Sequence, residues 1–114
     1  MTNLPQLTES KIRRWIGEPS FGRGQGYFQR SNILNPRCVG NTLKALCVGS
    51  RARPYAVEVT VGPHGIVAGE CSCPVGAGGQ CKHAAALLLT WLHTPQAFQE
   101  LKDPHTALEQ RSKA

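Results

Sequence analysis

Three cysteines and one histidine within thirteen residues constrain this chain more than any other feature of its sequence. One residue separates Cys71 from Cys73, seven residues follow, and one residue separates Cys81 from His83. Three thiolates and one imidazole are the number and type of ligands that close a tetrahedral zinc shell. The sequence therefore predicts one zinc ion per chain, held by these four side chains.

The spacing of the four ligands also indicates the local backbone. On an extended strand, side chains at positions i and i+2 leave the same face, so Cys71 and Cys73 can aim at one point. In a helix, positions i and i+2 lie about 200° apart, so Cys81 and His83 cannot both face a metal from the helix interior. We therefore expect Cys81 to be extended and a helix to begin at about Lys82. A proline and three glycines lie between the ligand pairs and favour a loop that doubles back.

A disulfide framework is the alternative use of these cysteines. The chain has five cysteines, an odd number, and no secretory signal peptide is recognisable before them. A zinc ion with four protein ligands has no open position for a substrate water, so we expect a structural role. The remaining Cys38 and Cys47 are expected to be buried free thiols. A hairpin turn at Gly40-Asn41 would place Cys38 opposite Leu43, too far from Cys47 for a disulfide.

At these residues the sequence resembles the SWIM zinc finger, whose pattern is Cys-x-Cys, a variable loop and Cys-x-His. The similarity includes an upstream segment with arginine, glycines and tyrosine (Phe21 to Phe28) and the Lys82-His83-Ala84-Ala85 entry into an apolar helix. It covers roughly Trp15 to Trp91. The resemblance implies a ββα zinc module in DNA-associated proteins, with DNA binding or protein contact as its proposed activities.

The predicted fold is a small α+β domain spanning residues 1–104. We expect an antiparallel sheet of three to four strands, two N-terminal helices, and a ββα-like zinc unit that ends in a buried apolar helix. Residues 105–114 are read as a charged tail, either the edge of a longer protein or the frayed end of a short one. The expected helices cover Thr8 to Ile16, Ser20 to about Arg30, about Lys82 to His93, and Pro95 to Lys102; the expected strands cover Ile33 to Val39, Thr42 to Gly49, Tyr55 to Val61, and Ile66 to Cys71.

Several details of these elements are testable against the structure. Residues 1–7 are expected to form a loose arm, and Thr8 and Ser20 to cap the first two helices. Three glycines in the second helix indicate close backbone approach, either to the core, which we favour, or to a phosphate backbone. In the last helix, Phe98 and Leu101 are expected to face inward.

Positive charge is concentrated in the N-terminal half of the chain. Between Lys11 and Arg53 there are nine basic residues and one acid, Glu18, which gives this window a net charge of +8 against +6 for the whole chain. No apolar run approaches the roughly 18 residues of a membrane span. Free thiols and a zinc thiolate centre fit a reducing compartment, the cytoplasm or nucleus.

These features favour nucleic-acid binding, with duplex or single-stranded DNA as the expected partner. Arginine contacts phosphates bidentately, and a lysine at the start of a helix adds to the anion-binding N-terminus. Such binding is mainly electrostatic and falls steeply with salt, and no sequence specificity is expected. The candidate contacts are Arg13, Arg14, Arg23, Arg30, Arg37, Arg51, Arg53 and Lys82.

The alternative function is a protein–protein interaction adaptor within a DNA-associated complex. An exposed apolar patch near Phe21 and Tyr27 would favour it. We expect no enzyme activity, no catalytic residues and no small-molecule substrate, because the sequence has no nucleophile elbow, phosphate loop or paired carboxylate motif. Binding to a membrane is not expected either.

Overall fold

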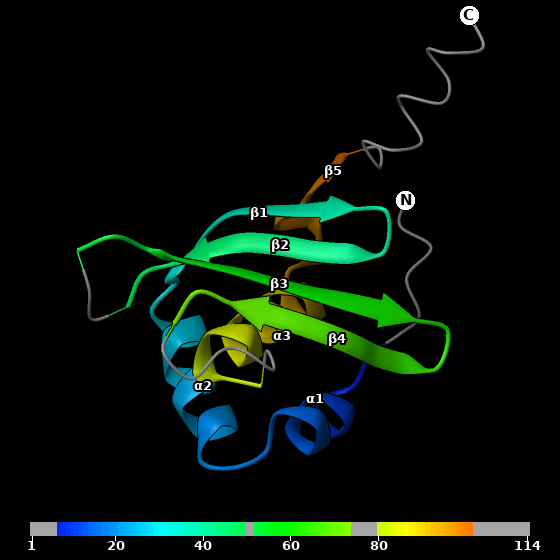
Figure 1. The fold of residues 1–114 in the computed structure, drawn as a ribbon, viewed down its shortest axis with the longest axis horizontal. Coiled ribbons are helices and arrows are strands. Elements are labelled where there is room, and N and C mark those ends of the chain that lie inside the picture. The colour runs from blue at the N-terminus through cyan, green and yellow to red at the C-terminus, as the bar shows by residue number, and fades with distance from the viewer. Residues whose placement is uncertain (1–6, 50–51, 74–79, 102–114) are drawn as a thin grey trace, which may run out of the picture.

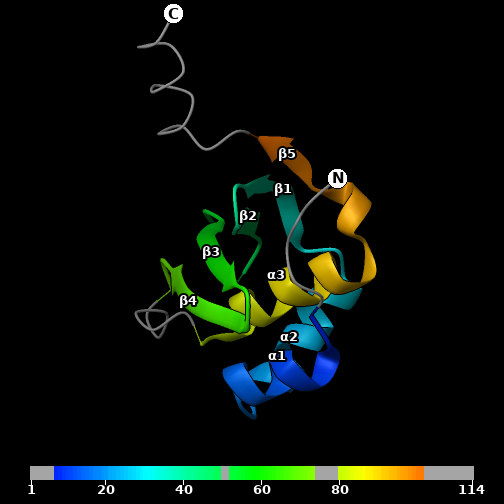
Figure 2. The same cartoon turned by 90° about the vertical axis from the view of Figure 1, so that its right-hand side faces the viewer.

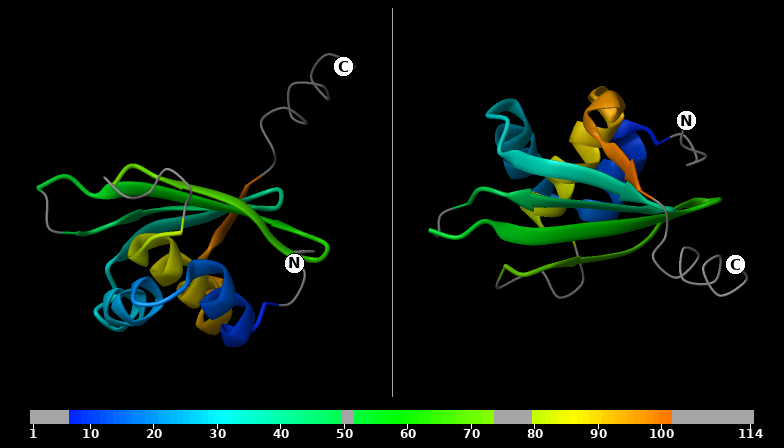
Figure 3. Two further views of the ribbon diagram at one scale, coloured as in Figure 1. Left: turned by 60° about the horizontal axis from the view of Figure 1, so that its bottom comes forward. Right: turned by 90° about the horizontal axis from the view of Figure 1, so that it is seen from above.

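A five-stranded sheet organises the chain, and the helices lie on one of its two faces (Figures 1 and 3). The structure is a computed structural model, and it describes residues 7–49, 52–73 and 80–101. Its elements, in chain order, are α1 (Glu9–Ile16), α2 (Ser20–Gln29), β1 (Ile33–Val39), β2 (Thr42–Cys47), β3 (Tyr55–Gly62), β4 (Gly65–Cys71), α3 (Lys82–His93), a 3-10 turn (Pro95–Ala97) and β5 (Gln99–Leu101). The predicted α+β class is confirmed.

The sheet is larger than predicted and is mixed rather than purely antiparallel. Its strand order is β4-β3-β2-β1-β5, with antiparallel pairs except between β1 and β5, which run parallel. The prediction of three to four antiparallel strands is therefore wrong, because the sheet also contains the parallel strand β5. No helix within the described ranges is long and apolar enough to cross a membrane.

The prediction of a last helix from Pro95 to Lys102 is also wrong for residues 95–101, the part of this segment that the structure describes. Only a 3-10 turn forms, and the chain becomes extended at Phe98 before Gln99–Leu101 pairs with β1. Phe98 is buried as predicted and packs edge-to-face against Trp91, with ring centroids 5.0 Å apart. Leu101 is 41% exposed rather than inward. Pairing with β1 satisfies backbone groups that would otherwise face solvent at a sheet edge, which a short terminal helix could not do.

Alternation of apolar residues gives the sheet its buried face. In β3 the side chains of Tyr55, Val57, Val59 and Val61 are buried, and in β2 those of Leu43, Ala45 and Cys47. The register pairs these two rows directly across the strands. In the neighbouring hairpin Cys38 lies opposite Leu43, and Cys38 and Cys47 are free thiols, as predicted.

α3 lies between the sheet and the other two helices (Figure 2). Every residue from His83 to Leu89 is buried, as is Trp91, which confirms the prediction of a central apolar helix. Its position explains its composition, because a helix covered on all sides has no polar face.

The first helix begins and ends as predicted. The Thr8 hydroxyl accepts a hydrogen bond from the Lys11 amide at 3.1 Å, and Gly17 follows the helix with a φ of 82°. Leu7 is only 3% exposed and joins the core, so the expected loose arm does not include it. Residues 1–6 of that arm, most of the glycine-rich loop (74–79) and the predicted tail (105–114) lie outside the described residues.

α2 departs from the prediction at its start. Ser20 is the first helical residue rather than the cap, and Pro19 at the cap position makes no side-chain hydrogen bond. Of the three glycines, Gly24 is buried against α3: a methyl group added there would overlap the Ala85 side chain and lie 2.8 Å from the Lys82 carbonyl oxygen. Core packing therefore accounts for Gly24, whereas positions 22 and 26 have side-chain atoms no closer than 3.4 Å.

We predict that Gly24→Ala destabilises the protein by about 1–3 kcal/mol, because the helices must separate to admit the methyl group. Gly22→Ala is the matched control in the same helix. Its nearest neighbour is a Glu18 carboxylate oxygen at 3.5 Å, an ordinary contact, so it should be neutral or stabilising by up to about 1 kcal/mol. Urea unfolding of both variants provides the measurement, and a Gly24→Ala variant as stable as the parent would contradict the packing argument.

Candidate metal centre

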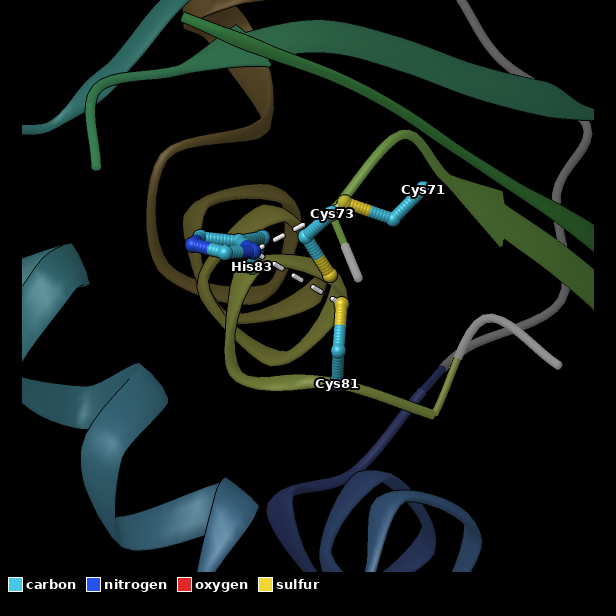
Figure 4. A group of neighbouring side chains, drawn as sticks. All are labelled: Cys71, Cys73, Cys81 and His83. Atoms are coloured by element: carbon cyan, nitrogen blue, oxygen red, sulfur yellow. Dashed lines mark hydrogen bonds between the residues drawn. The ribbon is translucent and has the colours of Figure 1, made fainter. Parts of the chain in front are cut away.

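The four predicted ligands come together where β4 ends and α3 begins. Their ligand atoms, three cysteine Sγ atoms and one ring nitrogen of His83, all lie within 4.8 Å of one another. Figure 4 shows the side chains of Cys71, Cys73, Cys81 and His83 turned toward a common centre. Cys73, Cys81 and His83 are buried, and Cys71 is partly exposed.

The first ligand pair is delivered by the end of β4. Cys71 is the last residue of that strand, and Cys73 follows it instead of lying on it. Two hydrogen bonds hold the chain beyond the strand: the Ser72 amide donates to the Ala56 carbonyl oxygen at 2.9 Å, and the Ala56 amide donates to the Ser72 hydroxyl at 3.0 Å. The backbone thus stays attached to β3 for one more residue, which brings Cys73 back toward the centre.

The second ligand pair is delivered by the start of α3, as the spacing predicted. Cys81 has extended dihedral angles (φ −116°, ψ 172°), and the helix begins at Lys82. The Cys81 sulfur accepts a hydrogen bond from the Ala84 amide at 3.5 Å and so serves as the N-cap of the helix. A thiolate at a helix N-terminus is stabilised by the helix dipole and the free amides.

The geometry of these atoms fits a tetrahedral zinc ion. Bonds of about 2.3 Å to sulfur and about 2.0 Å to nitrogen place neighbouring ligand atoms roughly 3.5–3.8 Å apart. The Nδ1 atom of His83 lies 3.6 Å from the Cys71 sulfur and 3.9 Å from the Cys81 sulfur. The residues present therefore fit a zinc ion bound through Nδ1. A metal with four protein ligands has a structural role.

Hydrogen bonding and burial shift the pKa values of the cysteines in and beside the site. The hydrogen bond between Cys71 and Cys81 lowers the pKa of Cys81, and contacts with His83 and the Ala84 amide act in the same direction, whereas this hydrogen bond and burial raise the pKa of Cys71. Outside the ligand set, burial raises the pKa of Cys47 to about 12, and the neighbouring thiols Cys81 and Cys73 add to this effect. Burial also raises the pKa of Cys38. Cys38 and Cys47 thus remain protonated near neutral pH, and neither joins the metal-binding group.

Two tyrosines and one glycine surround the ligand histidine, and sequence reasoning did not find this arrangement. The His83 ring lies 4.5 Å from the Tyr55 ring and 5.2 Å, edge-on, from the Tyr27 ring. A methyl group added at Gly49 would overlap the Tyr55 ring and lie 3.3 Å from Nε2 of His83. The alternation in β3 indicated that Tyr55 faces inward, but no local pattern indicated that it packs on a ligand.

The predicted nucleic-acid contacts do not form one continuous surface. Arg13 and Arg14 lie on α1, Arg23 on α2, Arg30 just after α2, and Lys82 at the start of α3. Arg53 lies between β2 and β3, and Arg37 lies on β1 opposite Lys44, on the sheet face that the helices leave open. Arg51 lies outside the described residues. The structure thus divides the candidates between the helical layer, the β2–β3 connection and the open sheet face.

Comparison with known proteins identifies the segment that contains the ligands. Residues 57–92 match the family model of the SWIM zinc finger. The match includes most of β3, all of β4, the four ligands, and α3 up to Leu92. Comparisons with curated proteins and with solved structures give no match. Together with the four-residue cluster, the family match supports one structural zinc ion in the chain.

We predict that Cys81→Ala or His83→Ala abolishes stoichiometric zinc binding and unfolds the junction between β4 and α3, because metal-binding free energy is folding free energy in a site of this kind. Elemental analysis should give one zinc per parent chain and almost none in either variant, with a loss of far-ultraviolet circular dichroism. Cys38→Ala, a buried cysteine outside the cluster, is the control and should retain its zinc. Full zinc content in His83→Ala would rule out that side chain as a ligand.

We also predict that Gly49→Ala weakens zinc binding about 10–100-fold, the effect usual for groups that orient metal ligands. The added methyl group would push Tyr55 and His83 away from their present positions. Competition with a zinc chelator measures this affinity. Val48→Ala, an exposed neighbour in the same segment, should leave the affinity unchanged, and equal affinities for the two variants would show that Gly49 does not position the histidine.

Proposed function

We propose that this chain, whose residues 57–92 match the SWIM zinc finger, is a nucleic-acid-binding module in which one structural zinc ion supports a basic surface on the helical layer. DNA is the proposed nucleic acid. The zinc ion stabilises the fold and does not contact the partner, and the proposal includes no catalytic step.

The observation that carries this proposal is a group of two cations around one aromatic ring beside the metal centre. The Arg30 guanidinium carbon lies 5.1 Å from the Tyr27 ring centroid, and the Lys82 ammonium lies 5.6 Å from it. The same ring contacts the zinc ligand His83 at its edge. The metal centre therefore helps to hold the Tyr27 ring, which in turn contacts the Arg30 and Lys82 side chains.

Both cations are available for a phosphate. Within the described ranges, neither Arg30 nor Lys82 forms an ion pair with a carboxylate. Lys82 is the first residue of α3, and because the Ala84 amide of that first turn already bonds the Cys81 sulfur, the contact to a phosphate would come from the Lys82 ammonium itself. A phosphate placed here would gain two charge-assisted contacts from different elements of the fold.

The open face of the sheet is a less suitable surface for a polyanion. Arg37 and Lys44 lie there, but Glu58 and Glu70 line the same shallow cavity of about 620 Å³. Lys44 is also paired with Glu58 at 3.6 Å. This mixture of charges supports placing the nucleic-acid surface on the helical side.

A protein adaptor is the second candidate. The feature expected to favour it, an exposed apolar patch around Phe21 and Tyr27, is not present, because Phe21 is fully buried. The exposed large apolar side chains of the described segments are Leu34, Val48, Val67 and Leu101. Leu34 and Val48 lie near one another on the open sheet face, where Leu34 is opposite Leu46 and the Val48 amide bonds the Asn32 carbonyl oxygen. This is not the patch expected around Phe21 and Tyr27, so the feature predicted to favour the adaptor is absent.

We predict that the zinc-loaded protein binds DNA with an affinity that falls steeply with salt. Fluorescence anisotropy with labelled duplex and single-stranded oligonucleotides, at about 50 and 200 mM salt, measures this. The slope of log K against log salt should be near −0.9 per phosphate contact for duplex and −0.7 for single strands. Absence of binding to either at about 50 mM salt would reject the proposal in favour of the adaptor.

A pair of charge reversals tests the location of the surface. Arg30→Glu should weaken binding at least tenfold and reduce the salt slope by about one contact. Arg37→Glu changes the net charge equally but acts on the open sheet face, so it should weaken binding much less. Equal losses in the two variants would mean that net charge, and not the surface around Tyr27, governs binding.

A further inference from the structure

We propose that the groove between α1 and the turn joining β3 to β4 holds one unpaired nucleotide of a single-stranded nucleic acid. This inference rests on the proposed nucleic-acid-binding function and adds to the surface around Tyr27 a second contact region, with a preference for single strands. The nucleotide base would lie against Trp15, and the adjoining phosphate would contact Lys11 and Arg14.

The groove is built by three segments that are distant in sequence. It has a volume of about 380 Å³, within the usual range of roughly 300–1,000 Å³ for small-molecule sites. Its main lining side chains are Lys11, Arg14, Trp15, His64, Ile66 and Gln80. The first three belong to α1, which contacts β4 (Figure 2), and Gln80 immediately precedes the metal ligand Cys81.

The charge of the groove favours an anion. Lys11 and Arg14 lie one turn apart on the helix, and no carboxylate is among the described residues that line the groove. Neither side chain forms an ion pair within the described ranges. Arg13 lies between them in sequence but does not line the groove. Its side chain pairs with Glu9 at 3.9 Å and lies over the Phe21 ring. The helix thus directs two uncompensated cations into the groove and keeps the third away.

The apolar part of the groove suits a base. Trp15 is partly buried and packs against the core, while its accessible part lines the groove next to Ile66. An indole held in this way offers a fixed surface for base stacking at little entropic cost. The Gln80 amide, which carries both donors and an acceptor, lines the same space and can bond a base edge.

These features favour a single strand over a duplex. In a duplex each base is paired and stacked on its neighbours, so its face cannot reach an indole that is recessed beside a helix. A single strand can present an unstacked base together with its phosphate, and aromatic stacking platforms beside basic side chains are the usual means of binding such strands.

The test uses the two tryptophans of the chain. In a Trp91→Phe background Trp15 is the sole tryptophan, and titration with oligodeoxythymidylate should quench its fluorescence, whereas a duplex should quench it much less. Trp91 is buried, so its replacement could disturb the fold. Photo-crosslinking of the unmodified protein to 5-iodouracil oligonucleotides gives a second measurement, and mass spectrometry should locate the crosslink at Trp15.

A second double variant provides a control matched in charge. Lys11→Gln combined with Arg14→Gln should weaken single-strand binding at least tenfold, whereas Arg13→Gln combined with Arg37→Gln removes the same two charges outside the groove and should weaken it less than threefold. Zinc content verifies that each variant is folded.

The outcomes distinguish this inference from the function on which it rests. Single-strand binding without Trp15 quenching or crosslinking, with equal losses for the groove and control variants, overturns the groove while leaving nucleic-acid binding intact. Absence of binding to any oligonucleotide at about 50 mM salt overturns both. Quenching and crosslinking at Trp15, together with selective loss in the Lys11 and Arg14 variant, supports the groove.

Discussion

The fold depends on four ligand atoms that link the end of the edge strand β4 to the first turn of the central helix α3. Cys71 and Cys73 come from the end of β4, and Cys81 and His83 from the start of α3. A domain of this length has a modest core, so a metal that joins its two layers contributes a large share of the net stability. Zinc binding and the packing of α3 against the sheet are therefore thermodynamically coupled.

The same centre also connects stability to the surface that we propose as functional. The Tyr27 ring packs edge-to-face with the ring of the ligand His83. The cationic groups of Arg30 and Lys82 lie near the same tyrosine ring. Gln80, on the other side of Cys81, lines the groove that contains Trp15. Loss of zinc would therefore displace residues from both basic regions, although no basic side chain is a ligand. Under the proposed function, this coupling would make the structural metal necessary for binding although the metal does not contact the partner.

The parts of the structure that the sequence predicted are those set by local chemistry. Ligand spacing required Cys81 to be extended with the helix starting at Lys82, and the alternation in β3 required its valines to face inward; both are confirmed. Features set by non-local packing were missed. The three residues of β5 carry no strand pattern and exist because β1 offers a free edge. The contact between Tyr27 and His83 depends on the close approach of α2 and α3 at Gly24, which no local pattern specifies.

X-ray absorption at the zinc edge of the purified protein tests the central claim most directly, because it reports the atoms bound to the metal. The structure predicts three sulfur ligands at about 2.3 Å and one nitrogen at about 2.0 Å. A shell of four sulfurs would mean that Cys47 replaces His83. A shell dominated by oxygen or nitrogen would mean that the cysteines do not hold the metal. Either of these two results would contradict the account.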